Sequence, residues 1–501
     1  MDLDGVVDSD STLVSFEAHP WLLARFGTLS QIGSGGGEDP DPPVPTEPDA
    51  DDQVPATNAW GAERSFPLAT VGMLAGNVVP WIYNEYPRGS GISQMNPRTW
   101  WRNFQEGMGW DDNNFSTNQF AHPYQGALYY NAARANGYSY WESFPFAVAG
   151  SLLWECCGET HLMSVNDWAA TSIGGAGVGE MLYRASSMVL DNTATGSERG
   201  WREAGAFLLN PSRGLSRLIR GDINRVYENP EHPNDRIPDR LGNTLHLGSR
   251  TIGDGLFLSD GSSTGGFFEL SMIYGSMFEL DRNKPFDFFT LSTQINFGEK
   301  TALGRLAIRA NLYHRDLKRT EGRLHKFLIV QNFDYDNNNT FEFGGQSVGA
   351  LLLSNWQISD RVRIVTEVNG DWMIMGAVNS EFALVAEIPG VRERFREYDF
   401  GTGLGTRLGG HLSIGDLQVA EVEYRATWLT TLNGSNANGE DANHFVQQGT
   451  VRGKIPVTDN FGIGLDWSVF SRDSYFSAED FDDVSQWSPQ YRVYVTMETS
   501  R

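Results

Sequence analysis

Cysteine is nearly absent from the sequence, since Cys156 and Cys157 are the only two in 501 residues. Adjacent cysteines rarely bridge each other, because the small ring is strained. We therefore expect two small buried hydrophobic side chains. The sequence shows neither a disulfide framework nor a cysteine metal site.

Basic residues are also scarce. The chain has 38 Lys and Arg against 63 Asp and Glu, a formal net charge of -25. Nucleic acid is held by clustered Lys and Arg, and no such cluster occurs, so we expect no nucleic-acid partner. The sequence also lacks H-E-x-x-H, a P-loop and a dinucleotide fingerprint. We therefore expect no metal site and no cofactor.

Long apolar runs are missing. No window approaches the ~20 continuous apolar residues of a membrane-spanning helix. The longest run, "FPFAVAGSLLWECC" at 144–157, is expected to be a buried helix. The start, "MDLDGVVDSD", lacks the basic residues and apolar core of a secretory signal. Either the protein is cytoplasmic or this is a mature or truncated chain.

The composition divides the chain into four regions. Residues 1–60 are acidic and rich in Gly and Pro, which predicts a disordered segment and linker. Residues 61–117 are expected to form a connecting region. Residues 118–235 are predicted to be a helical domain, and residues 236–501 to be a β-barrel.

Helix signals are explicit from residue 123 onward in the 118–235 region. Pro123 and Gly137 predict a helix over 123–136. Ser139 with Glu142 fits a capping box that opens a helix to about residue 157. Ser164 with Asp167 repeats this arrangement and opens a third helix to about residue 190.

Small and basic residues mark two further features of this region. Gly175 and Gly179 share one face of the third helix, where small residues allow close backbone approach. A shorter helix over 210–222 places Arg213, Arg217 and Arg220 on one side. The region is thus expected to be a compact α-helical unit.

From about residue 240 the hydrophobic period changes from 3.6 to 2. In "DFFTLSTQINFG" (287–298), apolar and polar residues alternate, and roughly a dozen segments follow this pattern, each near the ~10 residues of a membrane strand. A soluble sheet also alternates in this way. Long uninterrupted strands, a polar face with both signs of charge and aromatics near strand ends favour an outer-membrane barrel.

The expected fold class is therefore mainly β with a helical domain. An antiparallel transmembrane β-barrel of about 12 strands is preceded by a compact helical unit that plugs or caps it.

His122 is the first residue with chemical potential. Histidine is not a preferred N-cap, so its place before Pro123 needs another cause. A helix amino terminus disfavours imidazolium, which would leave His122 neutral and able to accept a proton or bind a metal. The alternative is a histidine that is hydrogen-bonded into the helix start.

Glu155 lies in an apolar helix, where a carboxylate is costly unless it is paired. Arg134 and His122 are the expected partners, in a structural ion pair or as a tuned acid or base. Asp167 is explained by the cap with Ser164, and Glu180 with Arg184 forms a helix-stabilising i, i+4 pair.

His122, Glu155 and Asp167, with Ser164 nearby, have the residue types of a Ser-His-acid hydrolase. No G-x-S-x-G motif surrounds Ser164, however, and the cap already uses its hydroxyl.

The segments "NQFAHPYQGALYYNAARANGYSYWESFPFAVAGSLLWECCGE", "SVNDWAATSIGGAGVGEMLYRAS" and "NPSRGLSRLIRGD" resemble a family of Gram-negative bacterial proteins. The family is catalogued only as containing a domain of unknown function, and many members look like outer-membrane β-barrels. The resemblance covers roughly residues 100–225 and implies a bacterial envelope setting without an established reaction. Its motifs provide these candidate structural or binding residues: Tyr124, Arg134, Glu142, Ser164, Asn166, Gly175, Gly179 and Arg213.

Together these patterns predict an outer-membrane protein with a structural or envelope-maintenance role, or one that binds lipid or a partner through its helical domain. The bilayer is the expected partner, with lipopolysaccharide, phospholipid or peptidoglycan as candidate ligands. Two alternatives stay open. One is a lipid-directed hydrolase that uses His122 with Glu155 or Asp167, and the other is a soluble periplasmic β-rich binding protein.

Overall fold

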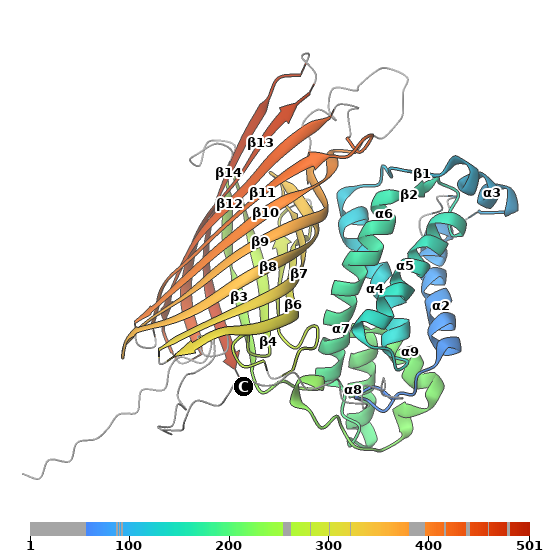
Figure 1. Cartoon of the computed structure of the whole chain (residues 1–501), viewed down its shortest axis with the longest axis horizontal. Coiled ribbons are helices and arrows are strands. Elements are labelled where there is room, and N and C mark those ends of the chain that lie inside the picture. Colours follow the sequence, from blue (N-terminus) through green and yellow to red (C-terminus); the bar gives the residue numbers. More distant parts are fainter. Residues whose placement is uncertain are drawn as a thin grey trace, which may run out of the picture.

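The structure is a computed structural model. It describes residues 57–500 except 87–88, 90, 92–93, 254–261, 281, 300, 321, 380–395, 415–416, 437–440, 459 and 478–480. The predicted acidic segment 1–60 lies almost wholly outside the described residues. A bundle of helices stands beside a tilted β-barrel (Figure 1).

Twelve antiparallel strands form one closed barrel, in which each strand pairs with the next and β14 pairs with β3. This confirms the predicted antiparallel barrel of about twelve strands. The strands are β3 (Leu241–Ile252), β4 (Ser263–Tyr274), β5 (Phe289–Phe297), β6 (Leu303–Thr320), β7 (Arg323–Asn337), β8 (Glu342–Ser359), β9 (Val362–Asn379), β10 (Tyr398–Ile414), β11 (Leu417–Thr431), β12 (Ala442–Pro456), β13 (Phe461–Phe476) and β14 (Val484–Ser500).

Alternation along the strands separates a charged lumen from an apolar outer surface. Arg425 on β11 donates to Asp334 on β7 at 3.0 Å, although three strands separate them, so the pair meets across the lumen. Arg309 on β6 reaches Glu367 on β9 at 2.9 Å in the same way. The charges of both signs predicted for the polar face are thus the lining of the barrel.

The opposite side chains form an exposed apolar belt on the outside. It includes Leu247, Trp372, Leu404, Trp428, Leu465, Trp467, Val493 and Val495. A closed barrel has no free edge, and an apolar outer band is how such barrels meet lipid. The barrel therefore places the protein in the bacterial outer membrane, and the soluble periplasmic alternative does not account for the belt.

Two apolar layers lie toward the two ends of the polar lumen. The layer toward the β7–β8 connection contains Phe343, Met373, Val378, Leu429 and Val446, with Phe341 stacked on Phe470 at 3.7 Å between ring centroids. At the other end, Met277, Phe278, Leu280 and Phe288, from the segment between β4 and β5, pack on Leu324, Leu328, Leu351 and Leu353. Between them lies a cavity of about 250 Å³, lined by Met277 and Phe341 at its ends and by charged residues in the middle.

The helical unit is built around α4. Its helices are α2 (Phe66–Glu85), α3 (Pro97–Glu106), α4 (His122–Arg134), α5 (Tyr140–Cys157), α6 (Val165–Ala169), α7 (Gly175–Val189), α8 (Gly196–Leu209) and α9 (Pro211–Arg220), with π-helices η1 (Thr117–Ala121) and η2 (Ala170–Gly174) and 3-10 turns η3 (Asp222–Asn224) and η4 (Pro233–Asp235). Short strands β1 (Met108–Gly109) and β2 (Met163–Ser164) pair in parallel. Helix α4 packs against α2, α5, α7 and α9.

The predicted helix signals are mostly confirmed. Ser139 and Glu142 form the capping box of α5, and the short helix predicted over 210–222 is α9. The predicted third helix is instead interrupted, because η2 separates α6 from α7.

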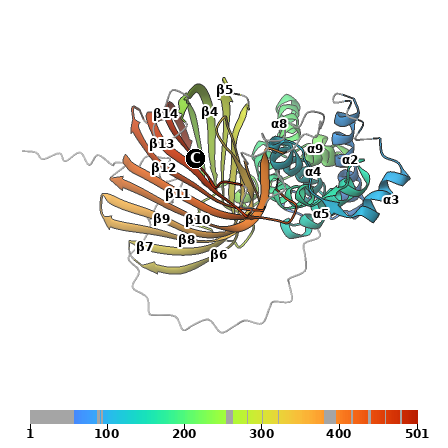
Figure 2. The same ribbon diagram turned by 90° about the horizontal axis from the view of Figure 1, so that it is seen from above.

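The helical unit packs against the outside of the barrel, so the expected helical plug is not confirmed. Helix α7 contacts β6 and β7, and η2 contacts β8. Tyr130 and Met181 belong to the same apolar cluster as the outward-facing Ile308 and Phe333. Figure 2 shows the helices beside the barrel wall. The lumen is already filled by its own side chains, and its 250 Å³ cavity cannot admit a helix ~10 Å wide.

Residues 61–117 were expected to form a connecting region, but they contain the long helix α2. By length and composition α2 is apolar enough to cross a membrane, and only 17% of its most apolar 18-residue window is buried. Thr70, Asn77 and the internal Pro80 interrupt its apolar sequence, which is why no continuous run marked it.

Cys156 and Cys157 form a disulfide, so the expectation of two unbridged side chains is wrong. Neighbouring side chains diverge inside a helix, but this pair ends α5, just before Gly158. The pair thus occupies the last two positions of the helix. The envelope outside the cytoplasm permits disulfides.

Candidate functional site

His122, Glu155 and Asp167 converge inside the helical unit. They come from α4, α5 and α6, and one donor atom of each lies within 4.8 Å of the others. All three residues are buried, and His122 Nε2 lies 3.4 Å from Asp167 Oδ1. The sequence named these three as candidates, and the fold brings them together.

His122 does not stand at a free helix start. The π-helix η1 runs directly into α4, and no side chain caps the junction. The helix-terminus argument is therefore wrong for His122. Burial is the cause that keeps the imidazole neutral, because it lowers the pKa of His122 to about 4 against the opposing charge of Asp111.

The cap at Ser164 is only half of the expected box. Ser164 Oγ accepts from the Asp167 N–H at 3.3 Å, but the Ser164 N–H donates to Glu155 Oε2 at 2.8 Å. The Asp167 carboxylate is thereby available to face His122. Asn166 Nδ2 holds it by donating to Oδ1 at 2.8 Å, and Asn166 accepts in turn from the Ser164 hydroxyl at 2.8 Å.

Arg134 was one expected partner of Glu155, but the two residues do not pair. The Glu155 Oε1 atom is buried without a hydrogen-bond partner among the described residues. Burial raises the pKa of Glu155 well above its usual value, and Glu159 and Asp167 add to this. Burial, followed by the charges of Asp111 and Glu159, raises the pKa of Asp167 likewise. The cluster thus contains two carboxyl groups whose charge is poorly compensated.

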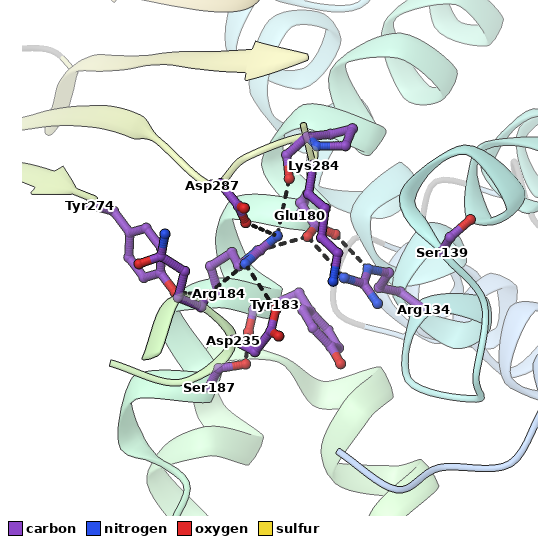
Figure 3. A network of polar contacts seen from close by, with 12 residues as sticks. Arg134, Ser139, Glu180, Tyr183, Arg184, Ser187, Asp235, Tyr274, Lys284 and Asp287 are labelled. Atoms are coloured by element: carbon purple, nitrogen blue, oxygen red, sulfur yellow. Dashed lines mark hydrogen bonds and ion pairs between the residues drawn. The ribbon is translucent and has the colours of Figure 1, made fainter. Parts of the chain in front are cut away.

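Arg134 instead joins a buried ion network centred on Glu180 (Figure 3). Arg134 Nε donates to Glu180 Oε2 at 2.8 Å, and Arg184 Nε donates to Glu180 Oε1 at 3.0 Å. The predicted Glu180–Arg184 pair is therefore confirmed, as part of a larger set. Burial alone would raise the pKa of Glu180, but the two guanidinium groups outweigh it and the pKa is lowered.

Arg184 extends this network to the barrel. Its guanidinium donates to the carbonyl oxygens of Asn234 at 2.7 Å and Pro285 at 3.0 Å, and lies 3.3 Å from Asp287. Pro285 and Asp287 belong to the same β4–β5 segment whose apolar residues close one end of the lumen. Arg184 of the helical unit is therefore hydrogen-bonded to the β4–β5 segment, which lies at one end of the barrel lumen.

The other end of the helical unit is tied to the far end of the barrel. Trp110 stacks on Phe400 at 5.6 Å between centroids and donates to the Asn433 carbonyl at 3.0 Å. Arg396 donates to the Asp111 carbonyl at 2.6 Å. Asp111 N–H donates to Asn166 at 3.0 Å, so the His122 cluster lies directly behind this junction.

The remaining candidates have structural contacts. A Cβ on Gly175 would lie 2.6 Å from Gly126 backbone atoms, and one on Gly179 would lie 2.7 Å from the Tyr130 ring, which confirms the close approach. Arg213 donates to Ser186 and Ser187 and stacks over Trp60. Glu142 also pairs with Arg64 at 2.6 Å. Tyr124 is 36% exposed on α4.

Sequence reasoning missed Thr171 and Asp111. Thr171 Oγ1 lies 3.4 Å from His122 Nδ1, on the π-helix η2. π-Helices are rare and often accompany functional sites, yet no residue pattern in this sequence announced one. Both groups reach the cluster from separate segments, so no spacing motif could have found them.

The helical unit and its cluster have a match among protein families. Residues 107–212 match the family described as "Domain of unknown function (DUF3943)". The match agrees with the resemblance drawn from residues 100–225, and the matched residues include His122, Glu155 and Asp167. A search of curated proteins finds no match.

Solved outer-membrane structures resemble the chain in part. The NanC porin is 13% identical with a TM-score of 0.25, covering 50% of this chain and 98% of its own. An outer membrane channel from Pseudomonas putida F1 is 11% identical with a TM-score of 0.26, covering 51% and 94%. The toluene transporter TodX of Pseudomonas putida is 8% identical with a TM-score of 0.22, covering 54% and 92%.

Proposed function

We propose that the protein is a structural, lipid-binding component of the outer membrane. In this proposal the barrel is a closed anchor, and the helical domain contacts lipid at the side of the barrel. Lipopolysaccharide and phospholipid are the candidate ligands, because both present acyl chains.

The observation that carries the proposal is the exposed apolar surface of α2. Val71, Val78, Val79 and Ile82 are exposed on a helix without an acidic or basic residue before Glu85. Its 20 residues span ~30 Å, the thickness of a bilayer core. Trp101 and Phe104 are exposed on the neighbouring α3, and aromatic residues are typical of the membrane interface.

The position of the bundle supports the same function. It rests on the outward faces of β6–β8, the surface that carries the lipid-facing belt elsewhere on the barrel. Exposed apolar patches of this kind on a soluble surface are uncommon unless something covers them. In this proposal, the lipid that surrounds the barrel covers both its outer apolar belt and the exposed apolar face of α2.

Site-directed fluorescence tests this proposal. The described residues contain no free thiol, so a fluorophore can be attached to Val78→Cys in the full-length protein reconstituted in phospholipid vesicles. A lipid-borne quencher should quench it as strongly as a label at Leu404→Cys, which is 70% exposed on the barrel belt. A label at Glu198→Cys, on the exposed part of α8, is the aqueous control.

The two outcomes separate clearly. Quenching at Val78 equal to that at Leu404 supports lipid contact. Quenching no stronger than at Glu198 shows that α2 faces water, and the proposed role of the helical domain is then wrong.

A lipid-directed hydrolase is the second candidate, because a hydroxyl, an imidazole and a carboxylate do meet at Thr171, His122 and Asp167. This is the order of groups in a nucleophilic triad, although both separations are 3.4 Å and exceed ordinary hydrogen bonds. Phospholipid hydrolysis by the purified protein, lost in His122→Ala, would establish it. Equal rates of phospholipid hydrolysis by the wild type and His122→Ala would refute the hydrolase function.

A further inference from the structure

The His122 cluster has the geometry of a cation site. The donor atoms of His122, Glu155 and Asp167 all lie within 4.8 Å of one another. Ligands bound to one Zn²⁺ at ~2.1 Å in a tetrahedron lie ~3.4 Å apart. The separation between His122 Nε2 and Asp167 Oδ1 is 3.4 Å, which is long for a hydrogen bond and suitable for two ligands of one ion.

The charges in the cluster also call for a cation. Glu155 and Asp167 are 0% and 1% exposed. Among the described residues no Lys or Arg forms an ion pair with either carboxylate, and His122 is the only titratable base in contact. Glu155 Oε1 is buried without a partner in the same part of the chain. Buried carboxylates are normally paired or bound to a metal.

The surrounding hydrogen bonds hold the three groups as ligands rather than as partners of each other. Thr171 Oγ1 lies near His122 Nδ1 at 3.4 Å, which leaves Nε2 to face the cluster. Asn166 fixes the Asp167 carboxylate, and the Ser164 N–H fixes Glu155 through Oε2. Metal ligands are commonly oriented by such secondary hydrogen bonds.

We propose that His122 Nε2 and the carboxylates of Glu155 and Asp167 bind one divalent transition-metal ion, of which Zn²⁺ and Mn²⁺ are the expected examples. An imidazole suits Zn²⁺, carboxylates suit Mn²⁺, and the absence of a thiolate from the set disfavours Cu⁺. Ca²⁺ requires six to eight oxygen ligands, which three side chains do not supply. The ion would stabilise the junction of α4, α5 and α6, three segments that otherwise bring unpaired charge together.

Metal analysis of the full-length protein in detergent tests this proposal. The protein is stripped with a chelator, incubated with Zn²⁺ or Mn²⁺, separated from free ion and measured by elemental analysis. We expect about one equivalent bound to the wild type and at least a tenfold weaker affinity in Glu155→Gln. His161→Ala is the matched control, because His161 is exposed and lies only six residues from Glu155 in the sequence.

Folding is monitored separately, so that loss of binding is not mistaken for loss of structure. Heat-modifiable migration reports the barrel and helical circular dichroism reports the helical unit. With Glu155→Gln folded, binding by the wild type and His161→Ala but not by the variant establishes the site. If Glu155→Gln does not fold, Asp167→Asn replaces it, and a rise of the wild-type helical melting temperature with Zn²⁺, absent in that variant, is the required result.

Two results would overturn the proposal. One is a stripped wild-type protein that binds neither ion at micromolar concentration and shows no shift in melting temperature. The other is an ion bound equally well by Glu155→Gln and the wild type, which would place it elsewhere on the chain. Neither result bears on the lipid contact of α2.

Discussion

Substitution of Gly126 should separate the helices that assemble the His122 cluster. A Cβ at this position would lie 1.8 Å from the Thr171 carbonyl oxygen and 2.9 Å from the Gly175 Cα. Real Cβ atoms essentially never lie within 3.0 Å of a neighbour, so α4 and η2 must move apart by about 1 Å or more. The obstacle is backbone, and no change of rotamer can relieve it.

We expect Gly126→Ala to lower the free energy of unfolding of the helical unit by at least ~3 kcal/mol, the upper part of the usual range for overpacking. Gly200→Ala is the matched control. A Cβ there meets nothing within 4 Å, and Gly200 is exposed within α8. The same change should therefore stabilise the helical unit by ~0.5–1 kcal/mol, because alanine is the better helix former.

Chemical unfolding followed by helical circular dichroism measures both values in the detergent-solubilised protein, with gel migration as the check that the barrel is intact. A Gly126→Ala variant with no helical signal on an intact barrel also agrees with the reasoning. A variant within ~0.5 kcal/mol of the wild type refutes it, because the two helices would then not be in contact as closely as described.

Further predictions concern the ion network and the lumen. Glu180→Gln should cost the helical unit ~3–5 kcal/mol, because it removes the carboxylate that pairs with the buried Arg134 and one of those that pair with Arg184; thermal melting measures this against the wild type. Because the pKa of Glu180 is lowered, its contribution is present above the ordinary value of 4.5 and is lost as the pH falls through the folded value. The melting temperature of the wild type should therefore fall as the pH drops below the ordinary value. A Glu180→Gln variant with the same acid dependence would show that another group is responsible. In planar bilayers the wild type should carry no steady current, since apolar layers bound both ends of the lumen. Phe278→Ala with Phe341→Ala should raise the conductance, each single variant should not, and a conducting wild type would contradict the closed lumen.

Local signals in the sequence predicted much of the fold. The capping box of Ser139 and Glu142 and the alternation along the strands are short-range patterns with direct physical causes, and both are confirmed. The place of the helical unit was not predictable in the same way. Ile308 and Phe333, which it covers, are the same kinds of residue that face lipid elsewhere on the barrel.

One outward residue did carry a signal. Gln331 lies among apolar neighbours on the outer face of β7, where lipid offers no hydrogen bonds. It accepts from the Tyr140 hydroxyl at 2.5 Å and donates to the Ile173 carbonyl at 3.0 Å. Gln331 interrupts the alternation of apolar and polar residues along β7, because the helical unit and not lipid covers this part of the outer face. The sequence singled out His122, Glu155 and Asp167, but it did not mark the two π-helices that adjoin α4 and α6.

The side of the barrel on which the helices rest has a consequence for biogenesis. They pack on β6, β7 and β8, while the seam that closes the barrel joins β14 to β3 on the opposite side of the ring. The helical segment also precedes every strand of the barrel in the chain. A folded bundle can therefore serve as a template on which the middle of the sheet is laid down. The first and last strands remain free to meet without displacing it, so folding of the bundle and closure of the barrel do not compete for the same surface.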